Sequence, residues 1–166
     1  ENIFHCPVIE SYGMTEASHQ MTSNHLPPGK RKPSKVGFAA GPKVAIIGEN
    51  KKISKNGKIG EVIIRGDNVC KEYINNPQAN KDSFIDGWFR TGDQGFYDDQ
   101  GFLQLTGRIK EIINKGGEKI SPLEIDEVVM GHKNIFQCVT FPIAHDKLGE
   151  EVALAVVLKS DYQLSE

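Results

Sequence analysis

Three short segments of the chain carry side chains of the types that bind a nucleotide. The first is Tyr12-Gly13-Met14-Thr15-Glu16, which brings an aromatic ring, a glycine, a hydroxyl and a carboxylate into one loop. Tyr12 offers a flat face for a purine, Thr15 a hydroxyl for a phosphate oxygen, and Glu16 an oxygen ligand for Mg²⁺. A plain turn with a helix cap is the alternative interpretation, and this segment alone leaves it open.

The second segment ends an aromatic run with an aspartate, in Gly87-Trp88-Phe89-Arg90-Thr91-Gly92-Asp93. An aspartate held at a strand end can accept two hydrogen bonds from the vicinal diol of a ribose. The alternative is an Asp93 that caps a β-turn. Trp88 is better explained as a core residue than as a ligand contact.

The third segment is rich in glycine and charge. It consists of Gly107-Arg108-Ile109-Lys110-Glu111, followed closely by Asn114-Lys115-Gly116-Gly117-Glu118. Arg108 lies where the pattern of expected elements changes, so Lys110 is placed where a hinge between rigid bodies would lie. Gly116 and Gly117 permit close approach of the backbone to a ligand, although a hairpin turn requires glycines equally.

Several other kinds of functional site are excluded because the chain lacks the residue spacing that they require. The chain contains no Gly-x-x-x-x-Gly-Lys-Ser/Thr loop and no Gly-x-Gly-x-x-Gly fingerprint. Its five histidines and three cysteines have no zinc-like spacing, and no Gly-x-Ser-x-Gly elbow supports a serine hydrolase.

The composition limits the remaining classes. The 20 Lys and Arg residues against 22 Asp and Glu residues give a net charge of −2, which does not favour a nucleic-acid-binding surface. No apolar run approaches the ~20 residues of a transmembrane helix. Three widely spaced cysteines indicate a reducing compartment rather than a disulfide scaffold.

The elements that would position these segments are mostly strands. A strand is expected at 7–11, and no regular element between 17 and 35. From residue 36 the pattern predicts a β-barrel-like subdomain with a short helix from Pro77 to Phe84 and a hairpin turn at 98–101. Its expected strands are 43–47, 60–65, 88–91, 95–97 and 102–106.

After Arg108 the pattern changes to a hairpin, a helix and two strands. The hairpin is expected at 109–120 around Gly116-Gly117, and the strands at 135–143 and 151–158. Ser121, Pro122 and Glu124 form a capping box that predicts a helix start, with Gly131 at its end. The fold class is therefore α+β: a β-barrel-like subdomain followed by the start of a small α+β domain.

In this order and spacing, the three segments resemble the adenylate-forming superfamily of acyl-CoA synthetases, coumarate-CoA ligases, luciferases and peptide-synthetase adenylation domains. The resemblance implies that residues 1–108 are the C-terminal part of a large AMP-binding domain, β-rich from about residue 36. Residues 109–166 would be the N-terminal part of a small C-terminal domain, with a hinge near 108–110.

The resemblance also implies a role for each candidate residue. By this resemblance Tyr12 with Gly13 would line the adenine site, Thr15 would contact phosphate and Glu16 would bind Mg²⁺. Asp93 would bind the ribose, and Arg108 the ribose or a phosphate. Lys110 would lie at the hinge, and Gly116 and Gly117 would pack along the pantetheine arm of CoA. The implied enzyme is an acid-thiol ligase that uses ATP and CoA, releases AMP, and first activates a small-molecule carboxylic acid as an acyl-adenylate. Its expected location is cytoplasmic or peroxisomal.

A closer resemblance is to the plant and fungal oxalate-CoA ligase branch. It depends on Met14-Thr15-Glu16-Ala17-Ser18-His19, on Arg31-Lys32-Pro33-Ser34-Lys35-Val36-Gly37 and on the run from Gly107 to Pro122. Oxalate is doubly charged, and His19 could donate to its second carboxylate, or be a loop histidine without a substrate role. A coumarate or a fatty acid remains an alternative substrate.

Two family segments are expected outside this chain: a phosphate loop before residue 1 and a Pro-Lys-Thr-x-Ser-Gly-Lys segment after residue 166. We therefore expect a fragment that is inactive by itself. The rival interpretations are a non-catalytic AMP- or acyl-binding module and a β-rich interaction domain without a ligand.

Overall fold

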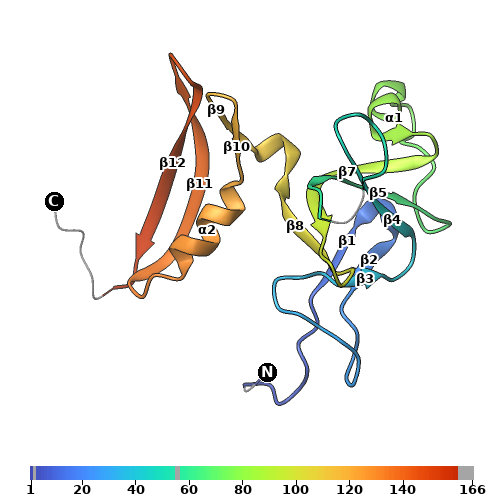
Figure 1. Cartoon of the computed structure of the whole chain (residues 1–166), viewed down its shortest axis with the longest axis horizontal. Coiled ribbons are helices and arrows are strands. Elements are labelled where there is room, and N and C mark those ends of the chain that lie inside the picture. The colour runs from blue at the N-terminus through green and yellow to red at the C-terminus, as the bar shows by residue number, and fades with distance from the viewer. Residues whose placement is uncertain (2, 55–56, 161–166) are drawn as a thin grey trace. The chain divides into compact units, whose positions relative to one another are not determined.

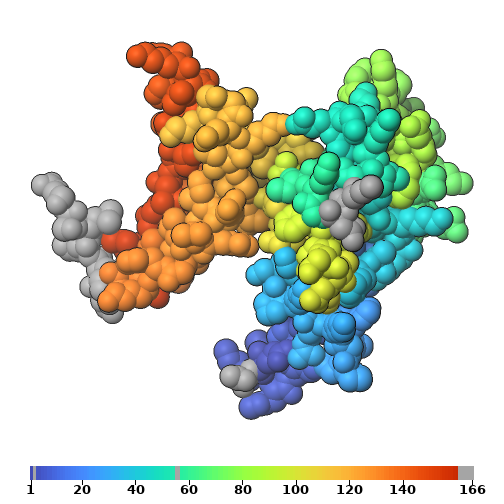
Figure 2. Space-filling model, in the orientation of Figure 1, coloured from blue at the N-terminus to red at the C-terminus, as the bar shows by residue number. Residues whose placement is uncertain are grey.

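A computed structural model describes residues 1, 3–54 and 57–160 (Figure 1). The chain divides into two compact units, Glu1–Leu105 and Thr106–Glu166, a boundary three residues before the expected one. Figure 2 shows the packed surface of each unit, blue through yellow for the first and orange to red for the second. The mixture of strands with a few short helices confirms the α+β class.

The first unit begins with a small antiparallel sheet of β1 (Ser11–Met14), β2 (His19–Ser23) and β3 (Phe38–Ala39). The 3₁₀ turn η1 (Thr15–Ala17) joins β1 to β2. The prediction of a strand at 7–11 was wrong, because β1 begins at Ser11. The prediction of no regular element between 17 and 35 was also wrong, because β2 lies there. The strand β2 has no apolar alternation that a sequence pattern could detect, because it is rich in polar residues. Thr22 is fully buried in it, and its hydroxyl is satisfied by donating to the Val36 carbonyl oxygen at 2.7 Å.

A second sheet contains the first-unit strands β4 (Lys43–Ile47), β5 (Gly60–Arg65), β7 (Trp88–Tyr97) and β6 (Phe84–Ile85). The strand β8 (Leu103–Arg108), of which the first three residues belong to the first unit, pairs with β7. The predicted bounds of β4 and β5 are confirmed. The helix α1 (Pro77–Ser83) is also confirmed, and the Asn76 side chain caps it by accepting from the Ala79 N–H at 3.1 Å. Within the described ranges both sheets of this unit are open, so the barrel-like subdomain is not a closed barrel.

Where two strands were expected at 88–91 and 95–97, a single bulged strand is present. Glu61 pairs with Gln94 and Ile63 with Arg90, so residues 91–93 of β7 stand opposite Val62 alone. Gly92 has φ = 75° in this stretch, a backbone conformation that favours glycine. Such a bulge redirects side chains locally, and here it determines the position of Asp93.

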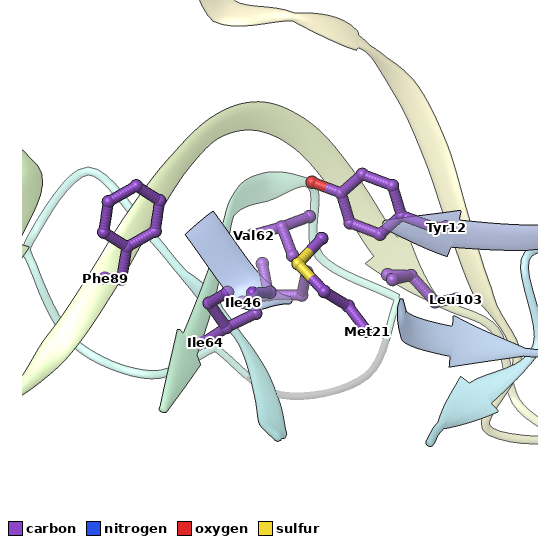
Figure 3. Packing of buried hydrophobic residues seen from close by; sticks show 8 residues of the cluster. Tyr12, Met21, Ile46, Val62, Ile64, Phe89 and Leu103 are labelled. Atoms are coloured by element: carbon purple, nitrogen blue, oxygen red, sulfur yellow. The ribbon is translucent and has the colours of Figure 1, made fainter. Parts of the chain in front are cut away.

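The core of the first unit joins its two sheets (Figure 3). The buried side chains of this cluster come from η1 and from the strands β1, β2, β4, β5, β7 and β8, and they are Tyr12, Ala17, Met21, Ile46, Val62, Ile64, Phe89 and Leu103. Tyr12 therefore belongs to the core and to the first candidate segment at once.

The second unit contains the 3₁₀ turn η2 (Ile109–Glu111) and the helix α2 (Pro122–Met130). Its sheet has the order β10-β9-β12-β11, with bounds Ile113–Lys115 (β9), Glu118–Ile120 (β10), Ile135–His145 (β11) and Gly149–Leu158 (β12). The Thr140 hydroxyl of β11 donates to Asp126 Oδ1 of α2 at 2.6 Å. Among the described residues, neither α-helix has the length and apolarity to cross a membrane.

The start of α2 differs from the predicted capping box. Pro122 begins the helix as expected, but Ser121 makes no capping hydrogen bond, and its buried hydroxyl donates to the Thr106 carbonyl oxygen. Gly131 ends the helix in a right-handed conformation with φ = −67° rather than a left-handed one. The Ser121 side chain satisfies a strand carbonyl instead of a helix N–H, which a local pattern does not reveal.

We predict that Ile64→Ala lowers the free energy of unfolding of the first unit by about 2–5 kcal/mol, because it opens a cavity in a closed core. Ile64 is 0% exposed, whereas Ile74 in the same unit is 84% exposed. Urea unfolding followed by the fluorescence of Trp88, the only tryptophan of the chain, measures the loss. Ile74→Ala is the matched control and should change the value by less than about 0.5 kcal/mol; equal losses would contradict the proposed core.

Candidate functional site

The first two candidate segments meet through one hydrogen bond. The Tyr12 hydroxyl on β1 donates to Asp93 Oδ2 on β7, across 81 positions of sequence. Tyr12 is 9% exposed and Asp93 is 6% exposed. Two polar groups in such surroundings are stabilised only by partners, so the contact determines the position of both side chains.

The bulge of β7 is held by side chains of its own strand and of β5. Glu61 Oε1 accepts from the Gly92 N–H at 3.1 Å, and Glu61 also forms an ion pair with Arg90 at 2.8 Å. The Thr91 hydroxyl donates to the Val62 carbonyl oxygen at 2.8 Å and accepts from the Asp93 N–H at 3.1 Å. Asp93 therefore lies inside a strand, which contradicts its interpretation as a turn cap.

A cavity of about 410 Å³ lies beside Tyr12. Its lining consists of the β1–η1–β2 hairpin, namely Ser11, Tyr12, Gly13, Met14, Thr15, His19 and Gln20. Four of the predicted residues, Tyr12, Gly13, Thr15 and His19, thus share one cavity. Ser11 and Gln20 were not predicted, because their position depends on the pairing of β1 with a strand that the sequence pattern did not reveal.

Gly13 allows the two strands of this hairpin to approach closely. A Cβ atom at Gly13 would lie only 1.7 Å from the His19 carbonyl oxygen, so no residue with a side chain fits at this position. Thr15 and His19 are exposed, so their polar groups are accessible from the cavity. The hairpin therefore presents a hydroxyl and an imidazole beside a buried phenol.

Glu16 lies in the same turn but is not part of the cavity lining. Its Oε1 atom accepts a hydrogen bond from the Tyr73 hydroxyl at 2.9 Å, and its main-chain oxygen accepts from the Cys70 N–H at 2.7 Å. Burial, and then the hydrogen bond to Glu16, raise the pKa of Tyr73 to about 12. Tyr73 was not predicted as a site residue, because 57 positions separate it from its partner.

The thiol of Cys70 lies in the same surroundings. Burial, and then the negative charge of Glu16, raise the pKa of Cys70 above its usual range. A raised pKa disfavours the thiolate, so Cys70 does not fit the role of a nucleophile.

The oxygen donors of the turn fit a magnesium ion that is shared with a substrate. Within residues 1, 3–54 and 57–160, no group of three or more His, Cys, Asp or Glu side chains could hold a metal on its own. Mg²⁺ usually keeps several waters and is bound by one or two carboxylates together with substrate phosphates. The Glu16 carboxylate is one donor of this kind, and Thr15 precedes it in the same turn.

The remaining candidate residues belong to the second unit. Arg108 ends β8 and Lys110 lies in η2, and both are exposed. Gly116 and Gly117 form the β9–β10 turn with φ = 60° and 96°. A hairpin turn accounts for both glycines, and their contact with a ligand stays a prediction.

Comparison with known proteins identifies similar sequences along the whole chain. Residues 1–74 match the family described as AMP-binding enzyme. The chain is 53% identical to the oxalate–CoA ligase of Saccharomyces cerevisiae, over 99% of this chain and 31% of that protein. It is 49% identical to the oxalate–CoA ligase of Arabidopsis thaliana, over 100% of this chain and 32% of that protein.

Other similar proteins are named for different acids. A long-chain-fatty-acid–CoA ligase of Mycobacterium tuberculosis is 36% identical over 96% of this chain and 31% of that protein. The solved structure of o-succinylbenzoate CoA synthetase from Bacillus subtilis in complex with ATP and a magnesium ion has a TM-score of 0.82 and 31% identity, over 92% of this chain and 32% of that one. The chain thus spans about a third of the length of the relatives it matches.

We predict that Tyr12→Phe lowers the free energy of unfolding by about 1–3 kcal/mol, because a buried carboxyl group loses a hydrogen-bond donor. Tyr97→Phe is the matched control, since the Tyr97 hydroxyl donates only to a main-chain oxygen, that of Val44, at 3.3 Å. Urea unfolding followed by Trp88 fluorescence compares the two variants. A loss no larger than that of the control would contradict a stabilising Tyr12–Asp93 contact.

Proposed function

This chain belongs to the family of AMP-binding, adenylate-forming enzymes, and we propose that it forms part of an acid-thiol ligase that activates a carboxylic acid with ATP and transfers it to CoA. The observation that carries the proposal is the Tyr12–Asp93 contact, which joins two of the three candidate segments at Tyr12, a residue that lines the cavity; Asp93 itself is not among the lining residues. A β-rich interaction domain without a ligand would not require a phenol, a hydroxyl and an imidazole to line one cavity.

The proposed reaction has two displacements. In the first, a carboxylate oxygen of the acid attacks the α-phosphorus of ATP, pyrophosphate leaves, and an acyl-adenylate forms. In the second, the thiolate sulfur of CoA attacks the acyl carbon, and AMP leaves. Displacement at phosphorus depends on positioning and on compensation of charge on the phosphate oxygens, and magnesium supplies positive charge there when bound.

The residues of the chain would act mainly by positioning. We assign Tyr12 and Gly13 to the wall of the adenine site and Asp93 to the ribose hydroxyls. Thr15 would donate a hydrogen bond to a phosphate oxygen, and Glu16 would hold the magnesium ion. Because Thr15 and Glu16 are consecutive in η1, one rigid turn would orient both groups.

The second unit would supply the moving part. We assign the first unit to the large domain and the second unit to the small one, with Lys110 at the hinge and Arg108 at the ribose or phosphate. Gly116 and Gly117 would then pack along the pantetheine arm of CoA. Rotation about a few residues would let one site serve both displacements in turn.

Oxalate is the acid that we favour. The identity of this chain to ligases named for oxalate, 53% and 49%, exceeds the 36% to the ligase named for long-chain fatty acids. His19 lines the cavity and is exposed, so it could donate a hydrogen bond to the second carboxylate of a small diacid.

We expect the full-length protein that contains this chain to form AMP, pyrophosphate and a thioester with highest kcat/KM for oxalate, when oxalate, malonate, acetate and coumarate are compared. A preference for another acid would contradict the assignment of oxalate as the substrate and leave the ligase proposal intact. Absence of products with every acid, combined with AMP binding of equal affinity by the 166-residue chain and the full-length protein, would favour a non-catalytic module.

We predict that Asp93→Ala in the full-length protein lowers kcat/KM for ATP at least about 30-fold, since two ribose hydrogen bonds of about 1–3 kcal/mol each are lost. Steady-state kinetics with ATP varied at saturating acid and CoA measures the effect. The matched control is Asp99→Ala, which removes an exposed carboxylate from the turn after the same strand. An unchanged ATP dependence in a folded Asp93→Ala protein would contradict the ribose assignment.

A further inference from the structure

Residues 68–73, to which no role has been assigned so far, hold the η1 turn in place. Residues 68–73 make four hydrogen bonds to residues 16–18. The Asn68 Nδ2 atom donates to the Ala17 carbonyl oxygen at 2.8 Å, and the Ser18 hydroxyl donates to the Asn68 carbonyl oxygen at 3.0 Å. The other two are the 2.7 Å and 2.9 Å bonds that Glu16 accepts from Cys70 and Tyr73.

Two of these bonds are accepted by main-chain oxygens of the turn, those of Glu16 and Ala17, and two involve side chains, the Ser18 hydroxyl and the Glu16 carboxylate. The main-chain bonds hold the path of η1, so they would be present in any well-anchored turn. The bond from Tyr73 differs, because its acceptor is the carboxylate that we assign to magnesium. A hydrogen bond to one carboxylate oxygen restricts rotation of the whole group, and so directs the second oxygen as well.

Tyr73 is itself held from two sides. Asn80 of α1 accepts from the Tyr73 N–H at 2.6 Å and donates to the Tyr73 carbonyl oxygen at 3.0 Å. The Tyr73 ring lies 6.3 Å from the Phe89 ring, centroid to centroid, and packs against the buried core of the first unit. A side chain anchored in this way is suited to fix a partner, since its own position costs little further entropy.

We propose that Tyr73 is a positioning residue, whose hydroxyl orients the Glu16 carboxylate for magnesium bound with ATP. This inference rests on the proposed function, because it takes the assignment of Glu16 as given. It adds a residue that acts through Glu16 and that touches neither nucleotide nor acid. A hydrogen-bond donor that orients a metal-binding side chain typically changes metal affinity by about 10- to 100-fold.

The test is Tyr73→Phe in the full-length protein, with Tyr97→Phe as the matched control. Each variant removes one phenol hydroxyl from the same unit, but only Tyr73 contacts Glu16. Binding of Mn²⁺ to the complex with a non-hydrolysable ATP analogue, followed by electron paramagnetic resonance, should weaken about 10-fold or more in Tyr73→Phe. The half-saturating Mg²⁺ concentration of acid-dependent ATP–pyrophosphate exchange should rise in parallel, and the control should change neither quantity.

A Mn²⁺ affinity equal to that of the wild type, or a shift of the same size in Tyr97→Phe, would overturn the positioning role. The double variant Glu16→Gln with Tyr73→Phe separates this role from general stability. If Tyr73 acts through Glu16, its loss should weaken Mn²⁺ binding no further in the Glu16→Gln background, whereas additive losses would overturn the inference.

The proposed function fails by a different result. A wild-type protein that catalyses no exchange with any acid refutes the ligase, whereas an active wild type with an unaffected Tyr73→Phe variant refutes only the positioning role.

Discussion

The hydrogen bond between Tyr12 and Asp93 is the contact on which the candidate site depends. It connects the β1–β2 hairpin to the bulge of β7, and both side chains are buried where water cannot replace a lost partner. Because the Tyr12 ring also belongs to the hydrophobic core, the same residue packs the first unit and forms a wall of the cavity. Stability and site geometry are therefore coupled through one phenol.

The rest of the site is organised by hydrogen bonds outside the regular main-chain ladders of the strands. Glu61 and Thr91 hold the bulge, and residues 68–73 fasten the η1 turn. Each bond satisfies a group that a bulge or a 3₁₀ turn would leave without a partner in a regular ladder. Binding sites are commonly built in this way: a packed sheet provides a rigid scaffold, and the irregular backbone beside it orients the functional groups.

The elements that were predicted correctly are those whose residues interact with sequence neighbours or alternate regularly. The strands β4 and β5 follow their apolar residues, and α1 follows Pro77 and the Asn76 cap. The errors arose where distant groups satisfy polar residues. Thr22 sits in a buried strand because it bonds to Val36, and Ser121 bonds to Thr106 instead of capping α2.

By itself, the sequence determined the α+β class, the family and most of the residues that carry polar chemistry, because these properties follow from residue type, order and short-range spacing. Only the tertiary structure decided which of those residues meet. It joined Tyr12 to Asp93, set Glu16 apart from the cavity, and brought in Tyr73, which no local pattern marks. The reason is physical: contacts across 57 and 81 positions arise from strand pairing and core packing, and neither is encoded within a single motif.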